Sequence, residues 1–173
     1  MPVMPGIPER TEAAPYYFKY IERVPDQDVL AVLDRQAAEL PKWLETISAE
    51  KSLHRYAPNK WTIREVLNHI NDGERLFQAR AFWFARGFST ELPSFDQDVA
   101  IVHAGANDIP WHTHIEEFRA VRQSSLTFFH NLPQSAWLKR GIASDNPFTV
   151  RALAYITAGH VEHHLAILRE RYF

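Results

Sequence analysis

Cysteine is absent from this 173-residue sequence, and long apolar runs are absent as well. Without thiols the chain has no disulfides, no cysteine-ligated zinc and no thiol nucleophile, so covalent chemistry would need other groups. No stretch approaches the ~20 consecutive apolar residues that span a bilayer. Residues 1–20 also contain no apolar segment of the secretory-signal type. We therefore expect a cytoplasmic protein without a membrane partner.

Charge of one sign is also scarce, because the formal net charge is only −2. A nucleic-acid-binding surface needs a clustered basic face, whereas lysine and arginine are spread along this chain without a basic run. Hydrophobic residues make up 46% and charged residues 23%, a globular composition whose length suits one domain with its own core. The sequence predicts a single domain over residues 1–173 that has a small-molecule substrate and no nucleic-acid partner.

Proline is concentrated at the start of the chain, where residues 1–25 hold prolines 2, 5, 8, 15 and 25. Proline fixes φ and removes a backbone hydrogen-bond donor. We therefore expect residues 1–25 to form an extended lead-in, anchored on the body by aromatic residues at positions 16–20.

Four later stretches carry apolar residues at helical spacing. The first follows Asp26, a candidate N-cap, and Pro41 is expected to kink it one turn before its end. The second starts at Thr62, where Glu65 completes a capping box, and ends before Gly87. The four predicted helices cover residues 26 to about 44, 62 to about 86, about 111 to 131 and about 149 to 172.

Two connections separate these helices in the second half of the chain. Residues 88–110 show little periodicity, and residues 134–147 are short and turn-rich. Long connections in compact domains are often functional. Four amphipathic helices with one long crossover predict an all-α fold, a four-helix bundle.

Nine histidines are many for this length, and two of them, His160 and His164, are four residues apart on the last predicted helix. Side chains at this spacing share a helix face, so both imidazoles can bind one ion. They also lie on the apolar stripe, where a polar group without a partner costs ~1–3 kcal/mol. A metal would satisfy both rings, and so would separate hydrogen bonds to neighbouring groups. His163 is expected at the edge or surface.

His69, on the second predicted helix, is the candidate third ligand. Gly73 lies one turn later, and because glycine costs ~1 kcal/mol in a helix interior, we expect something to need that space. Asp72 is on the same side and can orient a ligand histidine or accept a hydrogen bond from water at the metal. The alternatives are a satisfied core or surface histidine, and a solvated Asp72 or one paired with Arg75 or Arg80. The two arginines can instead reach an anionic substrate.

The other histidines, at positions 54, 103, 112, 114 and 130, are expected on the surface. They lie in or beside predicted loops or, for the pair at 112 and 114, two residues apart at a helix start.

Two segments carry a resemblance to a known family. Residues 56–70 (YAPNKWTIREVLNHI), followed by Asp72, Glu74 and Arg75, resemble the second helix of the DinB-like (DinB/YfiT) metalloenzyme family. Residues 151–156 (RALAYI) and 159–164 (GHVEHH) resemble that family's final helix. The resemblance spans nearly the whole chain, and its two histidine-bearing motifs are specific in combination.

This resemblance implies a DinB/YfiT-like four-helix bundle, typically a homodimer, that binds a divalent ion of nickel, zinc or iron. The implied ligands are His69, His160 and His164. Relatives in this family include transferases and isomerases that use low-molecular-weight thiols, and the iron-binding domain of ergothioneine-forming sulfoxide synthases.

Three hypotheses about function follow. Three imidazoles leave an open coordination position, as in catalytic metal sites, so the first is a metal-dependent small-molecule enzyme with Asp72 as an orienting or acid/base group. Its reaction would be S-transfer with a thiol co-substrate, or hydrolysis. The second is a non-catalytic, stress-related metal- or ligand-binding module whose fourth position is closed by Asp96, Asp98 or His103. The third is a structural dimer with an empty histidine pocket.

Overall fold

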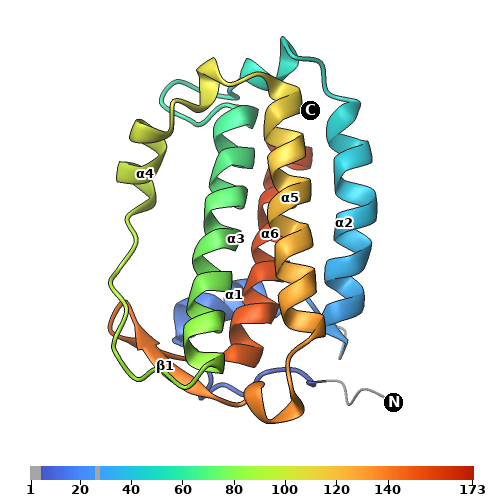
Figure 1. The fold of residues 1–173 in the computed structure, drawn as a ribbon. Helices are drawn as coiled ribbons and strands as arrows, with labels where there is room; N and C mark the ends of the chain where they lie inside the picture. Colours follow the sequence, from blue (N-terminus) through green and yellow to red (C-terminus); the bar gives the residue numbers. More distant parts are fainter. Residues whose placement is uncertain (1–4, 26–27) are drawn as a thin grey trace.

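Four long helices pack side by side in the computed structural model, which describes residues 5–25 and 28–173. The element contacts join α3 to α5 and α6, and α2 to α5 and α6 (Figure 1). The predicted all-α four-helix bundle is confirmed. The helices are α2 (Val29–Glu45), α3 (Ile63–Ala85), α5 (Trp111–His130) and α6 (Val150–Arg171).

The start of α3 shows how local sequence sets a helix boundary. The Glu65 N–H donates to Thr62 Oγ1 over 3.1 Å, and the Thr62 N–H donates to Glu65 Oε2 over 2.7 Å. These two bonds form the predicted capping box, which satisfies two N–H groups that a helix end leaves free. After Ala85 the chain turns at Gly87, whose φ of +86° suits glycine. Both predicted ends of this helix are confirmed.

The cap of α2 differs from the predicted one. Asp26 lies outside the described residues, and Asp28 caps the helix by accepting a hydrogen bond from the Ala31 N–H over 3.1 Å. The helix continues through Pro41 as far as Glu45 and is followed by the short turn η2 (Lys51–Leu53). Proline in a helix interior removes one hydrogen bond without having to end the helix.

The N-terminal segment is only partly extended, which corrects the predicted lead-in. A turn, η1 (Pro15–Tyr17), leads directly into a short helix, α1 (Phe18–Ile21), which packs against α6. The backbones approach closely because Gly159 has no side chain: a Cβ there would lie 2.0 Å from the Tyr20 carbonyl oxygen. The prolines therefore extend the chain only as far as the point where buried aromatic residues can pack as a helical turn.

The two connections also hold structure that periodicity does not show. Residues 88–110 contain a helix, α4 (Gln97–Ala104), and a turn, η3 (Ala106–Asp108). The turn η4 (Gln134–Ala136) precedes an antiparallel hairpin, β1 (Arg140–Ala143) and β2 (Asn146–Thr149). Its two turn residues, Ser144 and Asp145, both have positive φ, as a tight hairpin turn requires. These elements are short, so each contains too few residues to show the periodic spacing of apolar side chains that reveals a longer helix or strand.

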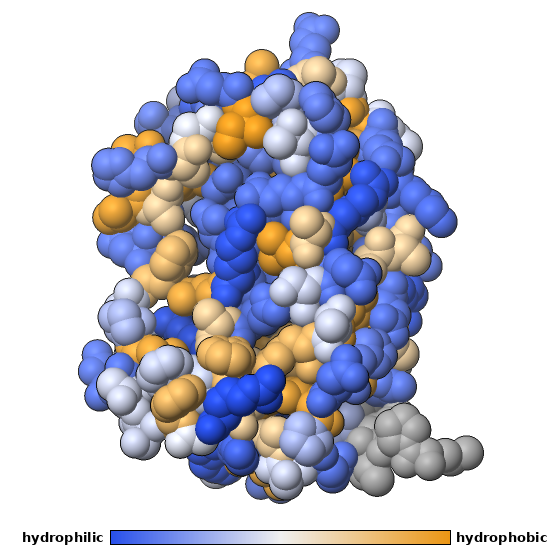
Figure 2. Space-filling view, in the orientation of Figure 1, coloured by the Kyte–Doolittle hydropathy of each residue, from blue (hydrophilic) through white to orange (hydrophobic). Residues whose placement is uncertain are grey.

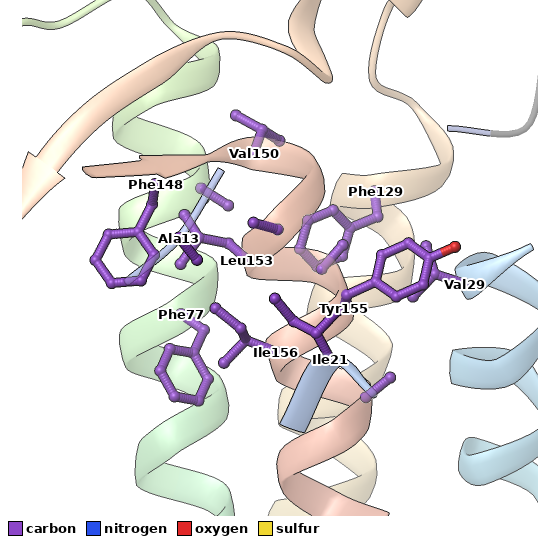
Figure 3. Packing of buried hydrophobic residues seen from close by; sticks show 14 of the residues in the cluster. Ala13, Ile21, Val29, Phe77, Phe129, Phe148, Val150, Leu153, Tyr155 and Ile156 are labelled. Atoms are coloured by element: carbon purple, nitrogen blue, oxygen red, sulfur yellow. The ribbon is translucent and has the colours of Figure 1, made fainter. Parts of the chain in front are cut away.

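The core of the bundle has two apolar halves. One lies among α1, the hairpin, the C-terminal part of α3 and the first turns of α6 (Figure 3). The other joins the N-terminal parts of α3 and α5 to the last turns of α6. Along α6 the first half ends at Ala158 and the second starts at Val161. A layer of polar side chains lies at the junction.

Arg122 is the centre of this polar layer and is fully buried. Its Nε and Nη2 donate to the two carboxylate oxygens of Glu74 over 2.7 and 2.9 Å, and its Nη1 donates to Gln36 Oε1 over 2.9 Å. Gln36 Nε2 in turn donates to the Ala158 carbonyl over 3.0 Å. The layer therefore ties together all four long helices at one level of the bundle, where a forked guanidinium matches a carboxylate.

The outer surface is mainly polar on the face shown in Figure 2, with apolar side chains in small patches. No helix in the described part of the chain is long and apolar enough to cross a membrane. Several exposed apolar residues belong to the connection that holds α4, namely Phe88, Phe95, Val99 and Val102.

Candidate metal centre

Helices α3 and α6 bring three histidines together where the two halves of the core meet. His69 comes from α3, and His160 and His164 come from successive turns of α6. The Nε2 atom of His160 lies 2.9 Å from Nε2 of His69 and 3.1 Å from Nε2 of His164. All three ligand atoms lie within 4.8 Å of one another. The structure thus assembles the three histidines that the sequence singled out.

The chemistry of these three nitrogens fits a divalent cation. A neutral imidazole has one N–H and one lone pair. The Nε2 atom of His160 faces the Nε2 atoms of His69 and His164. It carries either one N–H or one lone pair, so it can hydrogen-bond to both neighbours only by sharing that single group between them. A cation accepts all three lone pairs at once. Bonds of ~2.0–2.1 Å at tetrahedral angles place nitrogens about 3.3 Å apart, close to the two spacings of 2.9 and 3.1 Å.

Burial keeps the three rings neutral, the form in which histidine binds metal. Removal from water lowers the pKa of His69 to about 4 and that of His164 to about 2. The same cause, followed by its histidine neighbours, lowers the pKa of His160 well below its usual value. Desolvation disfavours the charged ring, so all three rings offer lone pairs at neutral pH.

These lowered pKa values predict that the metal-free protein loses stability in mild acid. In the unfolded chain a histidine takes up a proton near pH 6.5, whereas His69 in the folded protein does so only near pH 4. Between these values the unfolded state binds more protons, so stability falls as pH falls, by at most ~1.4 kcal/mol per pH unit for each histidine. Urea unfolding of chelator-treated protein from pH 7 to 5 measures this, and His164→Gln should flatten the slope. A pH-independent unfolding free energy would contradict it.

Gly73 explains how His160 fits against α3. A Cβ on Gly73 would lie 2.8 Å from Cε1 and 3.1 Å from Nδ1 of His160, closer than real side chains approach. The expectation that something needs this space is confirmed, and the group that needs it is the ring of His160.

Gly73→Ala should therefore weaken metal binding, although it should increase the intrinsic stability of the helix. Alanine favours a helix interior by ~1 kcal/mol over glycine, but the added methyl group displaces the ring of His160. We expect an affinity for zinc about 10-fold lower, comparable to the loss of a group that orients a ligand, measured by competition with a chelating dye. An unchanged affinity would mean that the ring moves aside without losing its position at the cluster.

Two pockets reach the histidines from different sides. The first, here called the tyrosine pocket, has a volume of about 230 Å³ and includes His69 and His160 in its wall. The second, of about 270 Å³, is bounded by Trp61 and Tyr172 and reaches His164. A larger groove of about 560 Å³ lies between α2 and α6 and has none of the three histidines in its lining. The tyrosine pocket is also lined by Tyr16, Tyr17, Tyr20, Gly73, Leu76, Phe77, Arg80, Phe95, Gln97 and Ser144.

Aromatic side chains hold the histidine rings in place, a role that the sequence did not reveal. The ring of Tyr20 meets that of His160 edge to face at 5.3 Å, and the ring of Trp61 lies 5.0 Å from that of His69. Tyr20 precedes the predicted helices, and Trp61 comes just before the capping box. Neither position has a periodic signal that would relate it to the site.

Asp72 lies on the turn after His69, and its described contacts lead away from the cluster. It accepts a hydrogen bond from Asn68 Nδ2 over 3.0 Å and lies 3.5 Å from Nη1 of Arg75. Arg75 also pairs with Glu117 over 2.7 Å, so the ion-pair alternative holds for this arginine. Burial raises the pKa of Asp72, against the opposing effect of Arg75.

The remaining histidines divide between surface and core. Those at 54, 103, 112 and 130 are exposed, as predicted. The prediction is wrong for His114, which is fully buried with Nε2 2.8 Å from the Ala106 carbonyl oxygen. Its burial depends on η3 folding over the start of α5, which the sequence did not show. His163 is half-buried, and Asp96, Asp98 and His103 lie outside the histidine cluster.

Comparisons with known proteins agree with this architecture. The family model of the DinB superfamily matches residues 32–168. The solved structure of YfiT from Bacillus subtilis, described as a probable metal-dependent hydrolase with an unusual four-helix bundle topology, superposes with a TM-score of 0.73. That match has 14% sequence identity and covers 94% of this chain and 89% of YfiT, so it shows a shared fold. No curated protein matches the chain.

Proposed function

This chain belongs to the DinB superfamily, and on that basis we propose that it is a metal-dependent hydrolase of a small molecule. The ligands are His69, His160 and His164. The observation that carries the proposal is the convergence of three neutral ring nitrogens beside two pockets. The description of YfiT as a probable metal-dependent hydrolase supports the reaction class.

The three histidines would bind the metal ion, and the neighbouring aromatic residues form the walls of the two pockets around it. A divalent ion of nickel, zinc or iron, when bound, supplies a Lewis acid that polarises a substrate oxygen and lowers the pKa of water. The ring of Trp61 lies beside that of His69 and forms part of the wall of the second pocket. Tyr20 lines the tyrosine pocket, and burial raises its pKa. A hydrogen bond to Tyr16 raises this pKa further, so the Tyr20 hydroxyl keeps its proton and donates a hydrogen bond to Tyr16, and both tyrosines line the pocket.

Asp72 is proposed as the orienting or acid/base residue. It follows His69 by three positions, on the next turn of α3, and its observed contacts are with Asn68 and Arg75 rather than with the histidines. Its raised pKa, caused by burial, suits a group that takes up and releases a proton nearer neutrality than a free carboxylate.

An open site distinguishes a catalyst from a module in which the ion only stabilises the bundle. The loop residues that would close a fourth position, Asp96, Asp98 and His103, do not join the cluster: Asp96 instead caps α4 by accepting from the N–H groups of Asp98 and Val99. Pockets reach the ring nitrogens from two sides. This favours catalysis over the non-catalytic, stress-related binding module.

The test is turnover by protein purified without an affinity tag and loaded in turn with zinc, nickel and iron. A panel of small esters, amides and phosphoesters should show metal-dependent hydrolysis that chelation removes and metal restores. His164→Ala should lose it, the exposed His112→Ala should keep it, and Asp72→Asn should fall about 10- to 100-fold, in metal affinity or activity. Metal binding without hydrolysis of any substrate would support the non-catalytic module instead.

The thiol-dependent reaction is the second candidate within the same site, favoured by the family resemblance. Adding low-molecular-weight thiols together with an electrophilic acceptor to the same metal-loaded protein tests it. Conjugation without hydrolysis would replace the hydrolase proposal. We also infer a homodimer from the family, which light scattering coupled to size exclusion measures directly.

A further inference from the structure

Arg80 is a buried cation on α3, on the same pocket wall as His69. Its side chain is only 2% exposed. Its Nη2 donates to Ser144 Oγ over 2.8 Å and to the Pro93 carbonyl over 3.3 Å, while its Nε has no hydrogen-bond partner. Throughout residues 5–25 and 28–173, no carboxylate pairs with this guanidinium.

The other buried arginines in the described ranges, Arg64 and Arg122, use all three of their guanidinium nitrogens. Arg122 forms two hydrogen bonds with Glu74, and Arg64, which has no carboxylate partner, donates from its three nitrogens to Ser52 Oγ and to backbone carbonyls. A buried charge without a counter-charge is costly because desolvation is not repaid. Burial does lower the pKa of Arg80, although the neighbouring Tyr17 opposes that effect. Among the described buried arginines, Arg80 is therefore the one with an unpartnered guanidinium nitrogen, and it lines a pocket.

The geometry of α3 relates Arg80 to the histidine cluster. His69, Gly73 and Arg80 all line the tyrosine pocket from the same helix. Eleven residues separate the first from the last, about 16 Å along the helix axis. Gly73 adds no side chain to the wall between them, so one pocket connects the cation to the ring nitrogens.

We propose that the tyrosine pocket binds a small molecule through an anionic group, a carboxylate or a phosphate, held by Arg80, while the rest of the molecule reaches His69 and His160. The free Nε and the neighbouring Nη2 form one edge of the guanidinium fork, and the longer Nη2 bond, 3.3 Å to the Pro93 carbonyl, is the one that an anion would replace. This edge matches two oxygens of a carboxylate or phosphate. The Ser144 hydroxyl lies beside this edge. Anion binding at Arg80 does not depend on the proposed function. Only the statement that the anionic group belongs to the substrate rests on it.

The experiment follows the Nε–H resonance of Arg80 by ¹H–¹⁵N NMR while the protein is titrated with succinate and with inorganic phosphate. Dimethyl succinate, which has the same carbon chain without charge, is the neutral control. We expect a saturable shift with at least one anion and none with the diester. Arg80→Gln lacks this Nε–H, so its affinity is read from the backbone amide resonance of Ser144, which is also followed in the wild type. That affinity should fall about 10-fold or more, as for the loss of a charge-assisted hydrogen-bonded pair. Arg86→Gln, an exposed position at the end of the same helix, should bind as wild type.

The wild-type titration alone can overturn the proposal, whether or not Arg80→Gln folds. An Arg80 resonance that neither anion moves would show that the guanidinium only ties the 88–96 segment to the hairpin turn. Equal affinities in wild type and in folded Arg80→Gln would overturn it as well. Repeating the titration on chelator-treated protein and on His164→Ala separates anion binding at Arg80 from the proposed metal-dependent hydrolysis. Anion binding that persists there stands even if no metal-dependent hydrolysis is found, and hydrolysis without anion binding leaves only the proposed function.

Discussion

His160→Ala is expected to abolish tight metal binding, the largest effect of any single change in this protein. His160 is the central member of the cluster, since its Nε2 lies within 3.1 Å of the ring nitrogens of both His69 and His164. Zinc sites with four ligands bind with ~10–16 kcal/mol, so one ligand contributes roughly 3 kcal/mol, or more than 100-fold in affinity. Metal analysis and titration calorimetry measure the loss directly.

Thermal unfolding supplies a second readout of the same prediction. A ligand that binds only the folded state raises the melting temperature, and it does so more the further the free ligand concentration exceeds Kd. Added zinc should therefore raise the melting temperature of the wild-type protein and leave that of His160→Ala almost unchanged. His163→Ala is the matched control, because this half-buried neighbour on α6 lies outside the cluster. Equally weak metal binding by wild type and His160→Ala would show that the three histidines are not a metal site.

Glu74→Gln is expected to destabilise the fold more than any other conservative change to a polar side chain discussed here. It removes the charge that matches Arg122, which is fully buried and bonded to both carboxylate oxygens of Glu74. Breaking a buried pair while leaving the other charge in place typically costs ~3–5 kcal/mol. Urea unfolding should show a lower midpoint with little change in slope, since the same surface is exposed on unfolding.

A surface pair and a double variant make this prediction specific. Glu117→Gln breaks the exposed contact with Arg75 and should cost less than ~1 kcal/mol. The double variant Glu74→Leu with Arg122→Met removes both buried charges, and we expect it to be more stable than Glu74→Gln because no charge is left uncompensated. A cost below ~1 kcal/mol for Glu74→Gln would mean that the polar layer contributes little to holding the four helices together.

The sequence by itself determined the features that depend on neighbours along the chain. The capping box of Thr62 and Glu65 and the positive-φ turn at Gly87 use contacts within a few residues, and both ends of α3 follow from them. The i, i+4 spacing of His160 and His164 places both rings on one face of α6 for the same reason. Periodicity also predicted all four long helices and therefore the bundle.

Only the tertiary structure decided which distant residues meet. His69 joins the pair on α6 because α3 packs beside α6 in one register, which Gly73 permits by leaving room for the ring of His160. Helical periodicity gives the apolar face of a helix but not its height relative to a neighbour. For that reason the sequence supported two ligands from their spacing, and it needed the family resemblance to name His69 as the third.

The same reason explains the residues whose environment the sequence did not reveal. Arg122 falls within an apolar stripe and becomes the centre of the polar layer, because Glu74 and Gln36 reach it from two other helices. His114 is buried by the folding of η3, and Arg80 is buried beneath the hairpin turn and the 88–96 segment. Local sequence thus determined the helices and one half of the candidate metal site. Packing between helices completed the histidine cluster and buried Arg80, whose Nε is free, beside the tyrosine pocket.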